Sequence, residues 1–265
     1  MPAPARQIVA FGGGGFSMEA ENSLLDDYVL SLARTERPRV CFLPSASGDA
    51  DHYVVRFYRA FEASRCRPSH VSLFRRDGVP MDVRAHLLAQ DVIYVGGGSV
   101  LSLLGVWSAH GIGLILREAW ESGVILCGVS AGSLCWFAEG ITAFHGAARP
   151  FTGLGLLPWS NTVHYDAERG RGDEYRRRLA EGMCPGFAAE DGTALHFTDA
   201  RLHRVVSSRL GARAFRMSRT SGRVVRRTLR AAYLGGDGAN ALPGRVADRG
   251  SPSLRVAPEP AAAAR

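Results

Sequence analysis

Lysine is absent from this sequence, because all 32 of its basic residues are arginines. A protein without lysine cannot form a Schiff base with a substrate or use a side-chain amine as a general base. It also cannot complete the phosphate-binding loop G-x-x-x-x-G-K-[ST]. Any catalytic chemistry must therefore use other side chains.

Cysteines are few, and long apolar runs are missing. The five cysteines are an odd number at irregular spacing, which indicates neither a disulfide framework nor a zinc site. No stretch of about 18 uncharged apolar residues occurs, and no apolar segment near the first residue is followed by a small-residue cleavage site. We expect a soluble, cytoplasmic protein with no membrane partner.

Arginines are concentrated in one part of the chain, where ten of them fall between Arg201 and Arg230. This density could mark a phosphate-binding surface. The arginines mostly alternate with apolar residues, however, as on the solvated faces of antiparallel strands, and few aromatics are available for base stacking. We favour the solvated face and do not expect a nucleic-acid partner.

Over the first half of the chain, short apolar runs alternate with helix-like stretches, which predicts a parallel sheet with helices on both faces. Asp51 and Ser99 stand where helix N-caps are expected. The expected strands are 7–11, 39–43, 70–74, 92–95 and 124–127, and the expected helices are 19–33, 52–63, 100–108 and 114–121.

From Ala194 onward the apolar residues repeat with a period of about two, in the runs 194–197, 204–206, 212–217 and 224–229. We expect these strands to form a β-rich C-terminal part of one α/β domain that spans residues 1–245. The Pro-, Ala- and Arg-rich segment 246–265 predicts a disordered tail.

Residues 128–132 read Gly-Val-Ser-Ala-Gly, which matches the G-x-S-x-G pattern of a sharp turn from a strand into a helix. Side chains at Gly128 or Gly132 would collide with the elements packed beside such a turn. "GVILC" before the motif is strand-like, and "AGSLCWFAEG" after Val129-Ser130 can be helical. Ser130 is then a candidate nucleophile, and the alternative is a serine that caps a helix in a tight turn.

A serine nucleophile also needs donors for the oxyanion that develops on the substrate. The N–H of Ala131 is one candidate. The glycine-rich segment "VIYVGGGSV" follows a strand at the edge of the sheet where ligands collect, so the N–H of Gly98 is the second; the segment can equally be a flexible turn. The earlier run Gly12–Gly15 lacks the spacing of a dinucleotide-binding fingerprint, and we interpret it as a tight loop that can line the site.

Of the histidines, His164 lies in a polar, loop-like segment from which an imidazole can reach a cleft. His196 and His203 fall within predicted strands, where we expect them to point to solvent or pack locally. His164 is therefore the preferred general base, although the chain order of α/β-hydrolases would require His196 or His203 instead.

The orienting acid is expected just before Gly192, where Glu190 and Asp191 stand in "FAAEDGTALHF". Such a pair is also common in plain turns. A carboxylate here would hold the imidazole tautomer, with Asp191 following Ser130 and His164 in the chain. If the chain has the α/β-hydrolase order, the acid is Asp166 or Asp191.

Four segments, "YVGGGS", "GVSAGSLCWF", "SNTVHYD" and "AAEDGTAL", resemble peptidase family S51, which comprises peptidase E (aspartyl dipeptidase) and its relatives. The resemblance spans residues 92–195. It implies a flavodoxin-like three-layer α/β fold related to class I glutamine amidotransferases. It also implies Ser130 as nucleophile, His164 as base, Asp191 as acid, and Gly98 and Ala131 as oxyanion donors. Peptidase E has glutamate as the acid, so Glu190 is the alternative.

Two positions depart from peptidase E at the expected substrate-binding residues, which are Gly97, Ser99 and Tyr175. The resemblance implies an asparagine after the glycine run, where this chain has Ser99, and an arginine that pairs with the substrate carboxylate, which falls on Tyr175. Aspartyl selectivity is therefore not expected unless a nearby arginine takes the place of the one that pairs with the substrate carboxylate. The candidates are Arg171, Arg176 and Arg177.

The sequence thus favours a serine hydrolase, a peptidase that cleaves dipeptides or short peptides through an acyl-enzyme. It would act as a monomer or homodimer and would require no metal or organic cofactor. One alternative is an esterase or another amidase with the same triad, for example one that hydrolyses a cyanophycin-like polymer. Another is a catalytically silent protein that binds a small ligand or nucleic acid and keeps the serine turn only as part of its fold.

Overall fold

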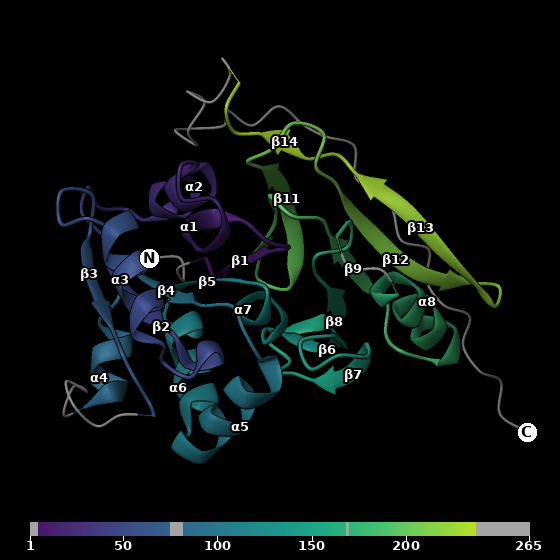
Figure 1. The fold of residues 1–265 in the computed structure, drawn as a ribbon, viewed down its shortest axis with the longest axis horizontal. Helices are drawn as coiled ribbons and strands as arrows, with labels where there is room; N and C mark the ends of the chain where they lie inside the picture. The colour runs from purple at the N-terminus through teal and green to yellow at the C-terminus, as the bar shows by residue number, and fades with distance from the viewer. Residues whose placement is uncertain (1–4, 75–81, 168–169, 237–265) are drawn as a thin grey trace, which may run out of the picture.

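The computed structural model describes residues 5–74, 82–167 and 170–236 of the chain. Its larger sheet has the strand order β14-β11-β10-β1-β5-β4-β2-β3 (Figure 1). The five strands from β1 to β3 in this order pair in parallel, and β10 joins β1 antiparallel. The strands are β1 (Gln7–Phe11), β2 (Arg39–Leu43), β3 (Arg67–His70), β4 (Val92–Val95), β5 (Ile125–Val129), β10 (Thr193–Thr198), β11 (Arg201–Ser207) and β14 (Ala232–Tyr233).

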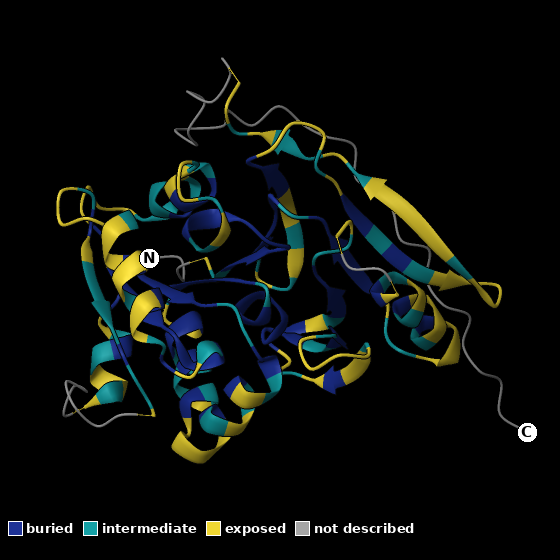
Figure 2. Ribbon diagram, in the orientation of Figure 1, coloured by how far each residue is buried: buried dark blue, intermediate teal, exposed yellow. Residues whose placement is uncertain are grey.

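Helices cover both faces of this sheet, so its central strands are apolar at successive positions rather than at alternate ones. In β1, Ile8 and Ala10 pack toward the face covered by α4, α5 and α6, whereas Val9 and Phe11 pack toward the face covered by α1, α2 and α3. Figure 2 shows these strands as the buried centre. The helices are α1 (Gly15–Met18), α2 (Leu24–Leu32), α3 (Asp51–Ala60), α4 (Val83–Leu88), α5 (Val100–His110) and α6 (Ile112–Glu121).

A second sheet, with the order β13-β12-β9-β8-β6-β7, follows the serine turn. The rings of Phe137 and Phe187, from β6 and β9, contact that of Phe197 in β10, with centroids 5.7 and 5.3 Å apart, so the two sheets share one core. The strands of the second sheet are β6 (Phe137–Thr142), β7 (Arg149–Thr152), β8 (Leu157–Thr162), β9 (Gly186–Ala189), β12 (Ala214–Thr220) and β13 (Arg223–Leu229). The remaining helices are α7 (Ala131–Leu134) and α8 (Arg171–Glu181), and a 3-10 turn, η1 (Ser45–Ser47), precedes α3.

The predicted fold class, an α/β protein of flavodoxin-like type with a β-rich C-terminal part, is confirmed. Several elements differ from the prediction. The predicted helix 19–33 is shortened to α2 at 24–32, because Glu19 and Asn22 bind Ser208 and hold the chain in a break after the short α1, which was not predicted. The predicted strand 70–74 is β3 at 67–70, and Asp49 turns the chain after it by accepting the N–H groups of Leu73 and Phe74.

The segment after Ser130 was predicted to be helical as far as Gly140. It is helical only to Leu134, because residues 137–142 form β6 and pair with β7 and β8. Ser99 caps α5 as predicted by accepting the N–H of Ser102 at 3.1 Å. Asp51 does not cap α3, because it is already the first helical residue and Ala50 occupies the cap position.

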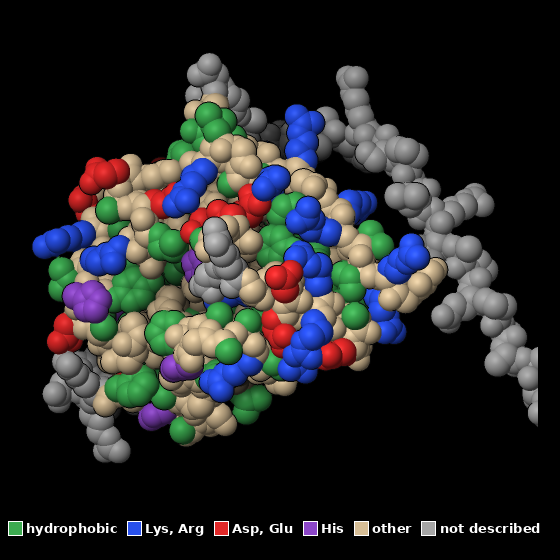
Figure 3. Space-filling view, turned by 45° about the vertical axis from the view of Figure 1, so that its right-hand side comes forward, with side chains coloured by type: hydrophobic (Ala, Val, Ile, Leu, Met, Phe, Trp, Pro, Cys, Tyr) green, Lys and Arg blue, Asp and Glu red, His purple; other side chains and the backbone are tan. Residues whose placement is uncertain are grey.

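The arginine-rich part of the chain, residues 201–230, contains β11 and the antiparallel hairpin of β12 and β13, and the arginines of β13 are exposed. Figure 3 shows basic side chains spread over this side of the molecule. The tail predicted from Val246 lies outside the described residues. Among the described residues, no helix alone is long and apolar enough to cross a membrane; only α5 and α6 together meet that criterion, and they are bent by 89°.

Candidate active site

Ser130 stands on the turn between β5 and α7 in a backbone conformation that non-glycine residues rarely adopt, with φ 55° and ψ −113°. The flanking glycines permit this turn. A Cβ at Gly128 would lie 2.3 Å from the carbonyl oxygen of Gly132, and a Cβ at Gly132 would lie 2.2 Å from that of Val95. The chain therefore passes too close to its neighbours for any side chain at either position.

His164 follows β8 and also has a positive φ, 52°. The backbone N–H of His164 donates to the carbonyl of Gly12 at 3.1 Å, and this bond fixes the loop of His164 against the first sheet. The ring nitrogen Nε2 lies 2.9 Å from Ser130 Oγ, and Nδ1 lies 2.5 Å from Asp191 Oδ1. Because a carboxylate can only accept, Nδ1–H donates to Asp191 and Nε2 is left to accept the proton of the serine hydroxyl.

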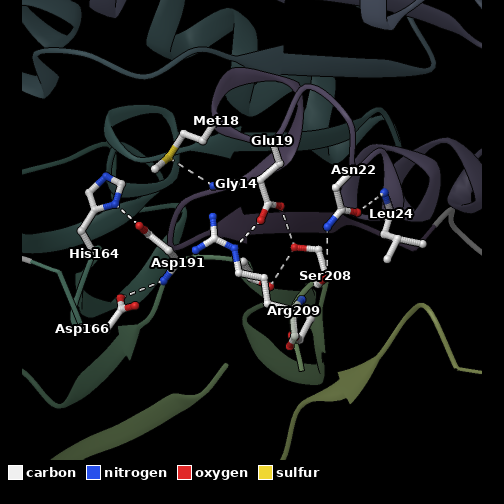
Figure 4. A network of polar contacts seen from close by, with 12 residues as sticks. Gly14, Met18, Glu19, Asn22, Leu24, His164, Asp166, Asp191, Ser208 and Arg209 are labelled. Carbon is white, nitrogen blue, oxygen red and sulfur yellow. Dashed lines mark hydrogen bonds and ion pairs between the residues drawn. The ribbon is translucent and has the colours of Figure 1, made fainter. Parts of the chain in front are cut away.

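Asp191 and His164 are shielded from solvent, with side chains that are 11% and 14% exposed. The backbone N–H of Asp191 donates to Asp166 Oδ1 at 3.0 Å, as Figure 4 shows. Glu190, the predicted alternative acid, does not face His164. Its carboxylate instead accepts from the backbone N–H and the guanidinium of Arg213 at 2.8 to 3.1 Å.

The glycine run at 12–15, predicted to be a tight loop that lines the site, lies directly against the His164–Asp191 pair. A Cβ at Gly13 would lie 2.1 Å from Asp191 Oδ1 and 3.0 Å from His164 Nδ1. The carbonyl of Gly13 also accepts the N–H of Gly192 at 3.1 Å. The loop thus connects the segments of His164 and Asp191, a role that the sequence alone did not reveal.

A cavity of about 380 Å³ opens beside Ser130 and His164. Gly98 has φ 136°, and a Cβ there would lie 2.2 Å from the carbonyl oxygen of Ala46, so only glycine fits this approach. The N–H of Gly97 donates to the hydroxyl of Tyr53 at 2.9 Å. The lining residues are Ser17, Met18, His52, Tyr53, Arg56, Gly97, Gly98, Val129, Ser130, Ala131, Leu134, Thr142, Phe144, His164 and Arg171.

Of the predicted substrate-binding residues, Gly97 is among the described residues that line this cavity, whereas Ser99 and Tyr175 are not. Ser99 Oγ instead lies 2.8 Å from Nε2 of His145, within hydrogen-bonding distance. Tyr175 is fully buried between α8 and the second sheet, where its hydroxyl lies 2.7 Å from Ser160 Oγ and burial raises its pKa. The prediction for Tyr175 is therefore wrong.

The register of α8 explains the error. Tyr175 and Leu179 are one turn apart and face the core formed with Phe215, whereas Arg171, one turn before Tyr175, lines the cavity and donates to the carbonyl of Val163 at 3.0 Å. The other predicted arginines, at 176 and 177, are exposed and pair with acidic residues of their own helix.

The other histidines predicted to lie in strands have local contacts. His196 is buried in β10, accepts from the hydroxyl of Tyr28 at 2.7 Å and donates to Gln7 at 3.1 Å; burial lowers its pKa to about 4. His203 is exposed, and its ring lies 5.3 Å from that of His196.

The residues that α3 contributes to the cavity, namely His52, Tyr53 and Arg56, were not predicted as site residues, because nothing in their local sequence distinguishes them from an ordinary amphipathic helix. Among the described residues, no group of three or more His, Cys, Asp or Glu side chains is arranged to hold a metal ion.

Comparisons with known proteins identify a family and agree with this fold. A sequence model of Peptidase family S51 matches residues 8–205. The chain is 46% identical over 231 residues to the uncharacterized peptidase YgaJ of Bacillus subtilis (strain 168), a match that covers 87% of this chain and 100% of that protein. It is 32% identical over 116 residues to peptidase E of Shewanella denitrificans, covering 40% and 49% of the two chains.

Solved structures of similar fold include a peptidase from an acI-B1 Actinobacterium, with a TM-score of 0.62 and 15% identity over 86% of this chain and 95% of that one. A putative peptidase E from Listeria monocytogenes EGD-e has a TM-score of 0.56 and 16% identity, covering 78% and 100% of the two chains. At these identities, the likeness concerns the fold.

Proposed function

Because the chain belongs to peptidase family S51 and is a serine-type peptidase, we propose that it hydrolyses dipeptides or short peptides through a triad of Ser130, His164 and Asp191. The observation that carries this proposal is the line of two hydrogen bonds, from Ser130 Oγ to Nε2 at 2.9 Å and from Nδ1 to Asp191 Oδ1 at 2.5 Å. This is the spacing that nucleophile, base and orienting acid require.

In the proposed reaction Ser130 Oγ attacks the scissile carbonyl while its proton passes to Nε2 of His164. Asp191 holds the ring in the tautomer that can accept this proton and stabilises the imidazolium that forms. The N–H groups of Gly98 and Ala131 stabilise the oxyanion of the tetrahedral intermediate. His164 then protonates the leaving amine, and water hydrolyses the acyl-enzyme with His164 again acting as base.

The cavity supports a short substrate. Its volume of about 380 Å³ is at the small end of the range for ligand pockets. Two arginines, Arg56 and Arg171, line the cavity, so a substrate carboxylate beside either of them would meet positive charge. In this proposal Arg171, rather than Tyr175, is the residue that contacts a substrate carboxylate.

A library of dipeptides assayed with wild type and Ser130→Ala tests the proposal. Loss of the nucleophile from a working triad reduces kcat by about 10⁶, so we expect no measurable turnover in Ser130→Ala. A fluorophosphonate, which reacts with activated serines, should label wild type only. Ser31→Ala on α2 is a matched control, because the Ser31 hydroxyl donates to a carbonyl of its own helix, that of Tyr28.

Near-normal turnover or labelling of Ser130→Ala would refute the triad. If esters were cleaved and peptides were not, with both dependent on Ser130, the triad would stand and the peptide substrate would be wrong.

A further inference from the structure

The loop that carries Asp191 is held by a group of polar side chains that take no part in the proposed chemistry. We call Glu19, Asn22, Ser208 and Arg209 the clamp (Figure 4). Glu19, which follows α1, accepts from Nε of Arg209 and, at 2.7 Å, from the hydroxyl of Ser208. Asn22 donates to the carbonyl of Ser208 at 3.1 Å. The clamp thus connects the break between α1 and α2 to the segment after β11.

The clamp contacts the residue next to Asp191. The N–H of Ser208 donates to the carbonyl of Gly192 at 2.8 Å. The stem of Arg209 lies against Gly192, since a Cβ there would be 2.7 Å from Arg209 Cγ, and Gly192 has φ 73°. With Gly13 accepting the N–H of Gly192, this residue is fixed from both sides. A shift of the clamp would therefore move Asp191 relative to His164.

The clamp also adds charge close to the triad. Glu19 is 7% exposed and Arg209 is 44% exposed. The pKa of the Arg209 guanidinium is raised first by its hydrogen bond to Glu19 and also by the negative charges of Asp191 and Asp166. Arg209 thus faces three carboxylates and offsets part of the negative charge beside His164. The other charged or titratable groups around the cavity are His52, Tyr53, Arg56 and Arg171.

We propose that Glu19 and Arg209 are positioning residues of the peptidase: they keep Asp191 on Nδ1 of His164, and their charges set where on the pH scale the enzyme becomes active. This inference rests on the proposed triad. The segment of α1 also supplies Ser17 and Met18 to the cavity wall, so the clamp joins the substrate pocket to the acid of the triad.

The test uses the full chain with Glu19→Gln, Arg209→Gln and Arg209→Lys. Arg84→Gln is a matched control, because Arg84 pairs with Glu118 on the surface between α4 and α6. Two rates are followed from about pH 5 to about pH 9, where histidine titrates: inactivation by a fluorophosphonate, which needs no knowledge of the substrate, and hydrolysis of the best dipeptide.

The two charge changes should shift the acidic limb of the rate profile in opposite directions. Arg209→Gln removes a positive charge from beside Asp191 and Asp166. The negative charge that remains favours protonated His164, so the midpoint of the acidic limb should rise by about half a pH unit. Glu19→Gln leaves the charge of Arg209 less balanced, so the midpoint should fall by a similar amount. Arg209→Lys keeps the charge and should keep the midpoint.

Loss of positioning should appear in kcat rather than KM. Displacement of a catalytic group by about 1 Å can cost about 100-fold in rate, so we expect kcat of Arg209→Gln to fall about 10- to 100-fold with KM nearly unchanged. Glutamine has nearly the same shape as glutamate, so Glu19→Gln changes the charge and little else. Thermal melting verifies that each variant is folded.

Shifts in the same direction for both variants, or unshifted profiles with unchanged kcat, would overturn the inference. The control Ser130→Ala separates failure of the proposed triad from failure of the proposed role of the clamp. If Ser130→Ala retains activity, the proposed triad itself is refuted. If Ser130→Ala is inactive and the profiles of the clamp variants match wild type, only the role of the clamp is refuted.

Discussion

Gly13→Ala tests the proposed triad by the addition of a single methyl group at a residue with no side chain of its own. The new Cβ would lie 2.1 Å from Asp191 Oδ1 and 2.8 Å from Asp191 Cγ, where ordinary contacts exceed about 3.4 Å. Something must therefore move by more than about 1 Å. The atoms in the way belong to the end of a side chain, so the Asp191 carboxylate gives way more easily than the backbone.

The movement should leave the fold largely intact and damage catalysis. Overpacking of this kind costs typically about 1–3 kcal/mol of stability. A misplacement of about 1 Å costs about 100-fold in rate, and full loss of the correct imidazole tautomer costs about 10⁴-fold. We therefore expect kcat of Gly13→Ala to lie about 10² to 10⁴ below that of wild type.

The assay is dipeptide hydrolysis together with the rate of fluorophosphonate labelling, with thermal melting as a check on folding. Gly105→Ala in α5 is the matched control. A Cβ at Gly105 meets nothing within 4 Å, so this variant should keep full activity and gain stability from better helix propensity. A folded Gly13→Ala with near-normal kcat would refute the reasoning, because Asp191 could then leave His164 without consequence.

Asp191→Asn should lower kcat by about 10⁴-fold, whereas Glu190→Gln should mainly lower the melting temperature; the reverse result would identify Glu190 as the acid. Burial raises the pKa of Asp26 to about 7 from 3.8. The folded state therefore favours the protonated form, and the free energy of unfolding should fall by up to about 4 kcal/mol as pH rises from about 4 to about 7. Denaturant titrations should find that this contribution disappears in Asp26→Asn; an unchanged slope would contradict it.

The turn at Ser130 could be predicted because the G-x-S-x-G pattern is local. Gly128 is required by its approach to Gly132 inside the motif, whereas Gly132 is required by Val95 at the end of the neighbouring strand β4. The strands β1, β2, β4 and β5 were equally clear, since burial on both faces leaves continuous apolar runs; β3, which is less buried, was misplaced. The catalytic roles of Ser130, His164 and Asp191 stay a proposal, although the three side chains lie within hydrogen-bonding distance of one another.

Of the second sheet, β12 and β13 were predicted from the period of two, whereas β6, β7, β8 and β9 were not, because these four do not have the composition of strands. Strand β8 ends in Ser160, Asn161 and Thr162, which are polar and fully buried. Tyr175 was misassigned for a different reason. Arg171 and Tyr175 lie one turn apart on the same buried face of α8, so what separates them is which turn of the helix reaches the cavity. Reading the sequence without gaps does not reveal this.

The three side chains of the proposed triad enter from two sheets. Ser130 follows β5 of the first sheet, His164 follows β8 of the second, and Asp191 lies where the chain passes from β9 back to β10. Ribosomes make the chain from its N-terminus, so a nascent chain would display the serine long before the carboxylate. We therefore expect the protein to become active only when its last third has been made and folded.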